Sequence, residues 1–310
     1  MDRRKVIVGS RASELALTQT HWVIRRLKEK FPHITFEVVE IKTIGDKILD
    51  KTLDKIGGKG LFVKEIETAL LQKEIDMAVH SMKDVPTEMT PELTIGAISD
   101  REDVRDVLIS RNGVSLRNLP AGAKIGTSSL RRAAQLLAFR PDLHVEPIRG
   151  NIATRIGKIE SLHLDGVILA AAGVLRMGWK NQVTEYISTE ICTPAVGQGA
   201  LGIQIRQEDS FIASLVQVLN NSEVEVAVKA ERSFMAALKG GCHVPIGAYA
   251  VFSEGMLHMD TVVASPDGRE VIRLSMDAPE KEYTELGNKA AKESMEKGAE
   301  KILKNIEVGE

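Results

Sequence analysis

The segment Lys124–Arg132 (KIGTSSLRR) concentrates groups that bind anions. A short predicted strand ends in glycine and is followed by three hydroxyl residues, Thr127, Ser128 and Ser129. A helix then begins, with Arg131 and Arg132 in its first turn. Backbone N–H groups, hydroxyls and guanidinium groups at one point suit a carboxylate or phosphate. The alternative is a serine N-cap followed by two solvated arginines. The N-terminal helix dipole repels arginine, which favours the anion site.

Arginines recur near the ends of two further predicted strands. Arg149 lies at the end of the strand in PIRGNIATR, and Arg155 lies about one turn into the next helix. Arg176 follows the strand Val167–Ala170 and a short turn rich in alanine and glycine. The carboxyl ends of parallel strands are where α/β folds bind ligands. Each arginine alone is typical of a surface residue, but the set predicts a site for a ligand with several negative charges.

The N-terminal third places reactive residues at comparable junctions. Arg11 and Ser13 lie between a strand and a helix in GSRAS. Just past the strand Met77–His80 come Ser81, Lys83 and Asp84. A neighbouring lysine favours the ionised form of a carboxylate, so Asp84 is a candidate for stabilising positive charge. The alternative is a turn aspartate before Val-Pro. His80 is predicted to pack within its strand.

The two cysteines have different sequence surroundings. Cys242 lies in GGCHVPIG, where two glycines after a helix predict a tight, accessible loop, so its thiol is a candidate nucleophile or covalent anchor. A buried structural cysteine is the alternative, and Cys192 matches that description better. Two cysteines in 310 residues predict free thiols and no disulfide framework. The histidines and cysteines show no spacing typical of metal ligands, so no metal is expected.

Composition excludes several classes of function. The formal charge is −2 and aromatic residues make up 4% of the chain, which argues against a nucleic-acid binder. No apolar run approaches the roughly 18 residues of a membrane helix. The start, MDRRKVIVG, predicts a first strand rather than a signal peptide. We therefore expect a cytoplasmic protein with no nucleic-acid or membrane partner.

The order of predicted elements indicates an α/β fold. Strands and helices alternate through the first two thirds, which predicts mostly parallel sheets covered by helices. The charged segment 100–106 separates two such units, and Leu201–Ile205 is one more strand that could belong to either. Ser222, with Glu225 three residues later, matches a capping box for the helix Glu223–Leu238. Three strands and one charged helix, Pro279–Leu303, then predict a small α+β part.

Six motifs together closely resemble the porphobilinogen deaminase (hydroxymethylbilane synthase) family. They are GSRASELAL, HSMKDVP, KIGTSSLRRAAQL, IRGNIATR, PAVGQGALGIQ and GGCHVPIGAYA. The resemblance runs from about residue 5 through the final helix. It implies two α/β domains like the halves of a periplasmic binding protein, with a central cleft, and a small α+β C-terminal domain. The implied bounds are 1–99 with 200–217 for domain 1, 105–193 for domain 2 and 222–310 for domain 3.

The resemblance also implies a reaction in tetrapyrrole biosynthesis. Four porphobilinogen molecules are condensed head to tail, ammonia is released each time, and linear hydroxymethylbilane is the product. A dipyrromethane cofactor is bound through a thioether to the cysteine that matches Cys242. The catalytic carboxylate of the family matches Asp84, which would stabilise positive charge on the pyrrole nitrogens and help to move protons. A monomer is expected.

The matching motifs assign binding roles to further residues. The implied cofactor-binding residues are Lys83, Ser81, Thr127, Ser128, Ser129, Arg131, Arg132, Arg155 and Asn151. The implied substrate-binding residues are Arg11, Ser13, Arg149, Arg176 and Gln198. The segment Gly45–Gly60 resembles the mobile active-site loop of the family, with Lys55 and Lys59 as candidate contacts. A cytosolic two-domain binding protein that clamps a dicarboxylate is the alternative, but it gives Asp84 and the Gly-Gly-Cys loop no purpose.

Overall fold

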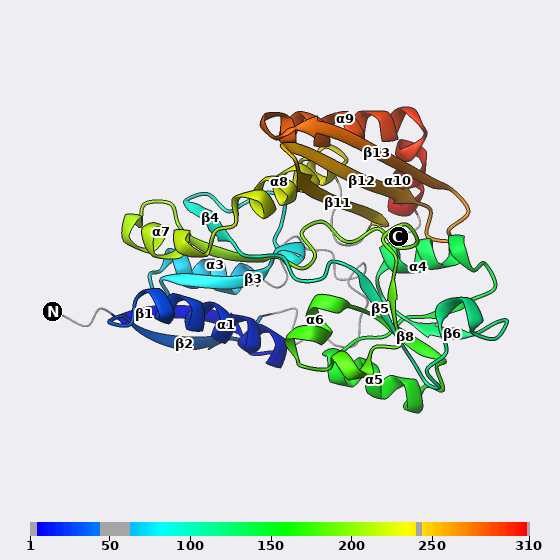
Figure 1. Ribbon diagram of the computed structural model, residues 1–310, viewed down its shortest axis with the longest axis horizontal. Helices are drawn as coiled ribbons and strands as arrows, with labels where there is room; N and C mark the ends of the chain where they lie inside the picture. The colour runs from blue at the N-terminus through cyan, green and yellow to red at the C-terminus, as the bar shows by residue number, and fades with distance from the viewer. Residues whose placement is uncertain (1–4, 44–62, 240–243, 309–310) are drawn as a thin grey trace. The chain divides into compact units, whose positions relative to one another are not determined.

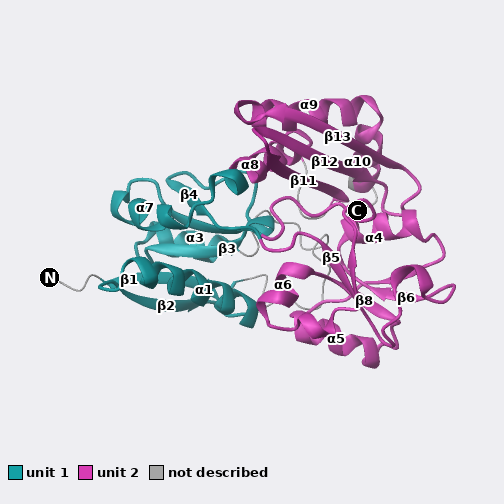
Figure 2. Cartoon of the chain, in the orientation of Figure 1, with its two compact units in different colours: residues 1–51, 57–101, 200–225 teal, residues 52–56, 102–199, 226–310 magenta. Residues whose placement is uncertain are grey.

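The computed structural model describes residues 5–43, 63–239 and 244–308. The chain divides into two compact units (Figure 2). The described residues of the first unit are 5–43, 63–101 and 200–225, and those of the second are 102–199, 226–239 and 244–308. Each unit is therefore assembled from separate stretches of the chain, because the chain leaves the first unit and later returns to it.

The first unit contains a five-stranded sheet with helices packed against it (Figure 1). In spatial order the strands are β2 (Thr35–Ile41), β1 (Lys5–Arg11), β3 (Met77–Ser81), β10 (Leu201–Arg206) and β4 (Leu93–Ile98). The other elements are α1 (Glu14–Lys30), α3 (Lys64–Leu71), α7 (Ser210–Val216) and the 3-10 turns η2 (Met82–Asp84) and η5 (Gln217–Leu219). β10 is antiparallel to both neighbours, whereas β1 is parallel to β2 and β3. The predicted strand Leu201–Ile205, which the sequence could not assign to one unit, is part of β10 and belongs to the first unit.

The helical periodicity of the sequence explains the packing of α1. Val23 and Leu27 are fully buried and lie on the face of the helix that meets Val8 and Met77 of the sheet. Ser13 is the N-cap and accepts a hydrogen bond from the Ala16 backbone nitrogen. Each large apolar side chain removed from water contributes about 1.5–3 kcal/mol, so this face fixes the helix on the sheet.

The second unit contains another five-stranded sheet. Its spatial order is β7 (His144–Glu146), β6 (Lys124–Gly126), β8 (Gly166–Ala170), β5 (Asp106–Ser110) and β9 (Glu185–Ile187). Around it lie α4 (Leu130–Phe139), α5 (Ile152–Ser161), α6 (Ala171–Arg176) and the 3-10 turns η3 (Leu116–Asn118) and η4 (Lys180–Gln182). β5 is antiparallel to β8 and β9, while β6 is parallel to β7 and β8. Each five-stranded sheet therefore has one reversed strand, in the fourth position.

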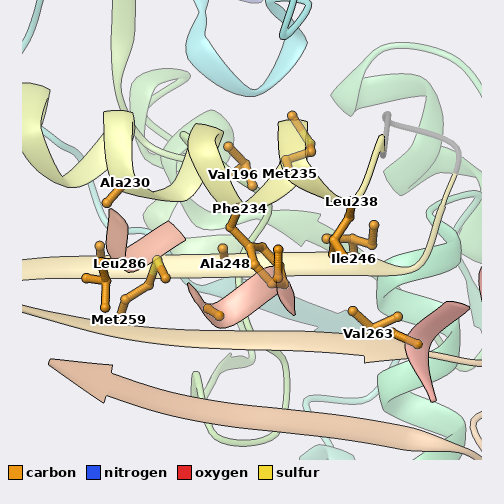
Figure 3. Close-up of a cluster of buried hydrophobic side chains, with 14 of the residues drawn as sticks. Val196, Ala230, Phe234, Met235, Leu238, Ile246, Ala248, Met259, Val263 and Leu286 are labelled. Carbon is orange, nitrogen blue, oxygen red and sulfur yellow. The ribbon is translucent and has the colours of Figure 1, made fainter. Parts of the chain in front are cut away.

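The same unit includes a three-stranded antiparallel meander. Its strands are β11 (Ile246–Ser253), β12 (Met256–Ala264) and β13 (Val271–Pro279), in that order. The helices that accompany it are α8 (Ser222–Ala237), α9 (Tyr283–Glu296) and α10 (Ala299–Val308), with a 3-10 turn η6 (Glu280–Glu282) before α9. Phe234 of α8 is fully buried among Ala248, Met259 and Leu286 (Figure 3). This core is separate from those of the two larger sheets.

Several local predictions are wrong for identifiable reasons. Asn221, not Ser222, caps α8, because its Oδ1 accepts the hydrogen bond from the Val224 backbone nitrogen. The C-terminal helix is two helices, since Gly298 adopts a φ of +104° that breaks the helix between α9 and α10. The turn expected after Ala170 is the short helix α6.

The predicted fold class is confirmed: two α/β sheets and a small C-terminal α+β part are present. Among the described residues, no helix is long and apolar enough to cross a membrane.

Candidate active site

In the first unit, two neighbouring strand ends bring predicted residues together. β1 and β3 are parallel and pair Gly9 with Ala78, so Arg11 runs alongside the end of β3. Asp84 closes the turn η2 that follows β3 directly, and both it and Lys83 are half-buried. Arg11 and Asp84 both influence the charge of His80, so they lie close to the same strand end. The structure thus gathers a carboxylate and two cationic residues at one edge of the sheet.

The serines of this edge have local partners. The Ser81 hydroxyl lies 3.1 Å from the side-chain nitrogen of Gln19, a buried residue of α1 that sequence reasoning did not single out. Ser13 caps α1 through its hydroxyl, with a distance of 3.4 Å to the Ala16 nitrogen. Ser13 therefore has a structural task in addition to the predicted substrate contact.

His80 packs within its strand, as predicted. Its side chain is 5% exposed, and its Nε2 lies 2.9 Å from Oε1 of Gln204 on β10. Burial lowers the pKa of His80 below its ordinary 6.5, although the hydrogen bond to Gln204 opposes this. His80 is therefore neutral over most of the physiological range.

In the second unit, the three hydroxyls before α4 organise the end of β6. The Thr127 hydroxyl accepts from the Ser129 backbone nitrogen at 3.2 Å, and Ser128 donates to the carbonyl of Ile148 at 2.6 Å. Ser129 is the N-cap of α4 and accepts from the Arg132 backbone nitrogen. These bonds hold the β6–α4 junction in one conformation, with Thr127 buried and both serines half-buried.

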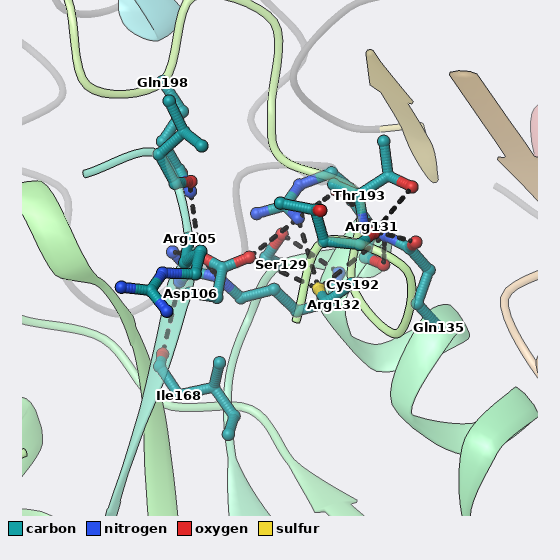
Figure 4. Close-up of polar contacts among 12 residues, drawn as sticks. Arg105, Asp106, Ser129, Arg131, Arg132, Gln135, Ile168, Cys192, Thr193 and Gln198 are labelled. Atoms are coloured by element: carbon teal, nitrogen blue, oxygen red, sulfur yellow. Dashed lines mark hydrogen bonds and ion pairs between the residues drawn. The ribbon is translucent and has the colours of Figure 1, made fainter. Parts of the chain in front are cut away.

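Arg131 and Arg132 are buried, with exposed fractions of 5% and 6%. Figure 4 shows their polar contacts. Arg131 Nη1 lies 2.8 Å from Asp106 Oδ2 and donates to the carbonyl of Thr193 at 2.7 Å. Arg132 donates from Nε and Nη2 to Asp106 Oδ1, at 3.0 and 2.7 Å. The alternative of two solvated arginines is wrong, because both guanidinium groups converge on one carboxylate.

Asp106 is the partner that sequence reasoning missed. It is fully buried at the start of β5, and it also accepts from Gln198 Nε2 at 3.0 Å and from the Cys192 thiol at 3.3 Å. Burial alone would raise the pKa of Asp106, but the charges of Arg131 and Arg132 outweigh it and hold the pKa well below its usual range. The missed signal was a carboxylate opening the apolar strand DVLIS.

Two predicted substrate residues lie near the segment before β10. Gln198 is buried, and its side-chain nitrogen donates to the carbonyl of Val104 at 2.7 Å as well as to Asp106. Arg176, at the end of α6, donates to the carbonyl of Gly199 at 2.6 Å. Burial lowers the pKa of Arg176 to about 10, against the opposing charge of Glu102. Arg176 remains a cation at neutral pH.

The region before and within α5 holds the remaining predicted residues. Asn151 is exposed and caps α5, accepting from the Thr154 nitrogen at 2.8 Å. Arg155 is half-buried and donates from Nε to the carbonyl of Gly150 at 2.8 Å, which orients its guanidinium group. Arg149 is also half-buried. Gly150 has a φ of +115°, a conformation that favours glycine.

Cys192 is a buried structural cysteine, as predicted. It is 0% exposed, and burial raises the pKa of its thiol to about 12, with the charge of Asp106 adding to the effect. Cys242, Lys55 and Lys59 lie outside the described residues. Within the described ranges, no group of three or more histidine, cysteine or acidic side chains could hold a metal ion.

The fold and the strand ends together define an α/β protein with arginines and hydroxyl residues at strand ends of one unit and a carboxylate with cationic neighbours at a strand end of the other. Comparison with known proteins narrows this class. Residues 6–214 match the family model "Porphobilinogen deaminase, dipyromethane cofactor binding domain", and residues 226–296 match "Porphobilinogen deaminase, C-terminal domain".

Curated relatives cover nearly the whole chain. The porphobilinogen deaminase of Alkaliphilus metalliredigens is 54% identical over 303 residues, which are 98% of this chain and 96% of the relative. That of Carboxydothermus hydrogenoformans is 52% identical over 304 residues, 98% of each chain. The chain belongs to the porphobilinogen deaminase family. It is a transferase of tetrapyrrole biosynthesis that works with a dipyrromethane cofactor.

The solved structures to which the chain is similar include periplasmic binding proteins. An arginine-specific binding protein of Salmonella typhimurium has a TM-score of 0.38 and 14% identity, over 73% of this chain and 93% of its own. The aliphatic sulphonate binding protein of Escherichia coli has a TM-score of 0.40 and 11% identity, over 76% of this chain and 71% of its own.

Proposed function

We propose that the cations of the second unit hold carboxylates and that Asp84 performs the chemistry in the porphobilinogen deaminase reaction. The reaction joins four porphobilinogen molecules head to tail, releases ammonia and yields linear hydroxymethylbilane. When bound, the dipyrromethane cofactor supplies the terminal pyrrole to which the first substrate is joined. Every pyrrole carries an acetate and a propionate side chain, so the growing chain is strongly anionic.

The observation that carries the proposal is the buried trio of Arg131, Arg132 and Asp106. Two guanidinium groups share one carboxylate, so the trio has one net positive charge. A buried charge without a counter-charge is costly, and a ligand carboxylate would complete the arrangement. Arginine also binds carboxylates in a bidentate way that lysine cannot. The donor set therefore fits a cofactor that carries several carboxylates.

The other predicted residues are assigned contacts with ligand groups. We assign contacts with cofactor carboxylates to Ser81, Lys83, Thr127, Ser128, Ser129, Asn151 and Arg155. Contacts with substrate and the growing chain are assigned to Arg11, Ser13, Arg149, Arg176 and Gln198. Ser13, Thr127 and Gln198 also have partners within the protein, in a helix cap, in the β6–α4 junction and at Asp106. Lys55 and Lys59 stay predicted loop contacts.

Asp84 stabilises the positive charge that develops on pyrrole nitrogens when two rings are joined. A half-buried carboxylate at a strand end is less screened than one in open water, so its charge acts strongly over short distances. Its oxygens can also accept the proton that a ring loses on bond formation.

Cys242 is the residue that forms the thioether to the cofactor. The chain has two cysteines, and Cys192 is buried and held as a thiol by its raised pKa. A thiolate is the nucleophile in such a reaction, so Cys192 is unsuited to it.

Intact-protein mass spectrometry tests this proposal. We expect the native protein and a Cys192→Ala control to carry the added mass of a dipyrromethane, whereas Cys242→Ala lacks it. Arg132→Leu is expected to yield protein without cofactor, because the buried counter-charge for a cofactor carboxylate is lost. Retention of the added mass and of full turnover by Cys242→Ala would contradict the proposal.

The same proposal includes the domain bounds, the oligomeric state and the cellular location. We propose three domains with the bounds 1–99 plus 200–217, 105–193 and 222–310. We also propose that the protein acts as a monomer in the cytoplasm, where porphobilinogen is its small-molecule partner.

A further inference from the structure

A continuous chain of side-chain hydrogen bonds lies beside the turn that carries Asp84. The Thr90 hydroxyl donates to Glu67 Oε2 of α3 at 2.6 Å. Glu67 Oε1 accepts from Gln204 Nε2 of β10 at 2.9 Å. Gln204 Oε1 in turn lies 2.9 Å from His80 Nε2 of β3. We call Thr90, Glu67, Gln204 and His80 the relay chain.

The direction of each bond in the relay chain is set by chemistry. An ionised carboxylate only accepts hydrogen bonds, so the NH₂ group of Gln204 must face Glu67. The carbonyl oxygen of Gln204 then faces His80, and the imidazole must place its proton on Nε2 to donate to it. The relay chain therefore specifies both the orientation of an amide and the tautomer of a histidine.

The relay chain brackets Asp84 in the sequence. His80 lies near the end of β3, just before the turn that contains Asp84, and Thr90 lies after that turn. Both residues are hydrogen-bonded within the relay chain, so the segment between them is held at both ends. β10 also holds the turn itself. The Met82 backbone nitrogen donates to the carbonyl of Ala200 at 3.0 Å. A Cβ at Gly202 would lie 2.3 Å from the Met82 sulfur, so the Met82 side chain packs directly against this glycine of β10.

We propose that the relay chain positions the turn Met82–Asp84 for catalysis, and that His80 does this as a neutral imidazole with its proton on Nε2. This inference rests on the proposed role of Asp84. His80, Gln204, Glu67 and Thr90 are then positioning residues, because they act through the placement of Asp84 and do not touch substrate.

The electrostatics of the site explain why His80 must stay neutral. Burial is the largest influence and lowers the pKa of His80; Arg11 of β1 acts in the same direction. Gln204 of β10, Glu67 of α3 and Asp84 of η2 oppose it. A protonated imidazole would place a fixed cation near Asp84 and reduce the negative potential that the substrate cation needs. Protonation of His80 in acid should therefore lower activity.

Replacement of Gln204 by leucine tests the inference. Gln204→Leu cuts the relay chain in the middle, and we expect kcat to fall by about 10-fold to 10²-fold through misplacement of Asp84. KM should stay close to the native value, because the carboxylate contacts of the substrate are untouched. Intact mass should show the cofactor retained. The matched control is Gln207→Leu, which removes a hydrogen bond to the Leu93 carbonyl away from the turn.

Two further readouts distinguish positioning from simple structural support. Ring ¹⁵N shifts of His80 in the native protein should report a neutral Nε2–H tautomer that persists below pH 6.5. In Glu67→Gln, the amide oxygen can still accept from Gln204, and the amide nitrogen can donate to the Thr90 hydroxyl in place of the native bond. The variant lacks the charge of Glu67, which raises the pKa of His80, so the acid limb of the kcat profile should move to lower pH. A merely structural residue would not move that limb in this direction.

Three results would overturn the inference. The first is a Gln204→Leu enzyme that turns over as fast as the native one. The second is a Gln204→Leu enzyme in which kcat and KM both worsen in step with a lowered thermal midpoint, by the same amounts as in the Gln207→Leu control. The third is a proton found on Nδ1 of His80. If loaded Asp84→Asn were inactive while Gln204→Leu remained fully active, only the relay chain would fall; activity in Asp84→Asn would instead reject the role of Asp84.

Discussion

The two five-stranded sheets have the same arrangement of strands but carry different polar side chains on the reversed strand. Both have a reversed strand in fourth position, β10 in the first and β5 in the second. In the first sheet, the reversed strand brings the neutral amide Gln204 to His80, beside a half-buried carboxylate. In the second, it brings the buried carboxylate Asp106 to two arginines.

Under the proposed function, this difference separates the reaction from the binding of carboxylates. A neutral His80 adds no further cation beside Asp84, whose charge then acts on a substrate cation during the reaction. A setting in which cations are locked on a buried carboxylate holds them at fixed positions before any ligand arrives, so little order is lost on binding. The same strand arrangement can thus support either chemistry or binding, depending on which side chain the reversed strand presents.

Of the changes that test this difference between the two sheets, Asp106→Asn is expected to have the largest effect. The substitution leaves two buried guanidinium groups without their carboxylate, and breaking such a pair typically costs about 3–5 kcal/mol. We expect a matching fall in the free energy of unfolding, measured with denaturant, together with loss of the cofactor mass. Asp142→Asn is the control, because it breaks an exposed pair with Arg140 and should have little effect.

A stability of Asp106→Asn equal to that of the Asp142→Asn control would contradict the view that this carboxylate holds the arginines. Stable protein without cofactor would instead show that Asp106 serves binding alone.

A smaller effect on stability is expected at acidic pH, and the two units should lose stability at different pH values. His80 has a folded pKa below its ordinary 6.5, so the unfolded chain binds more protons there and stability of the first unit falls as the pH drops below 6.5. Asp106 has a folded pKa below its ordinary 3.8, so its contribution to the second unit is complete above that pH and is lost only in stronger acid.

Hydrogen exchange followed across this pH range can separate the units. Amides of β3 and β10 should lose protection at a higher pH than amides of β6 and β8. The reverse order would show that the relay chain is not the acid-sensitive part of the molecule.

Local patterns predicted most of the fold because they depend on neighbouring residues. The strands β3 and β6 follow from short apolar runs, and the hydroxyl residues noted before α4 include its cap, Ser129. The reversed strands could not be predicted, since pairing of β10 with β3 depends on contacts between residues about 120 positions apart. The cap at Asn221 was misassigned because serine and asparagine compete for the same position with similar preference.

For the candidate site, the sequence predicted which residues gather but not how they are paired. The strand ends indicated Arg131, Arg132 and Asp84 because charge at such positions is unusual. Asp106 and Gln204 were missed, as each lies in an apolar strand whose polar side chain matters only through a distant partner. A polar residue in an apolar strand, as at Asp106, is visible in the sequence, but its distant partner is not.

The central claim, that Asp84 performs chemistry while the arginines bind, is tested most directly by turnover of cofactor-loaded Asp84→Asn. Loss of one preorganised charge typically lowers turnover by about 10²–10³. We predict a fall of this size in ammonia release and hydroxymethylbilane formation, with porphobilinogen still bound and Asp84→Glu partly active. Near-normal turnover by a loaded Asp84→Asn enzyme would remove Asp84 from the mechanism and contradict the account.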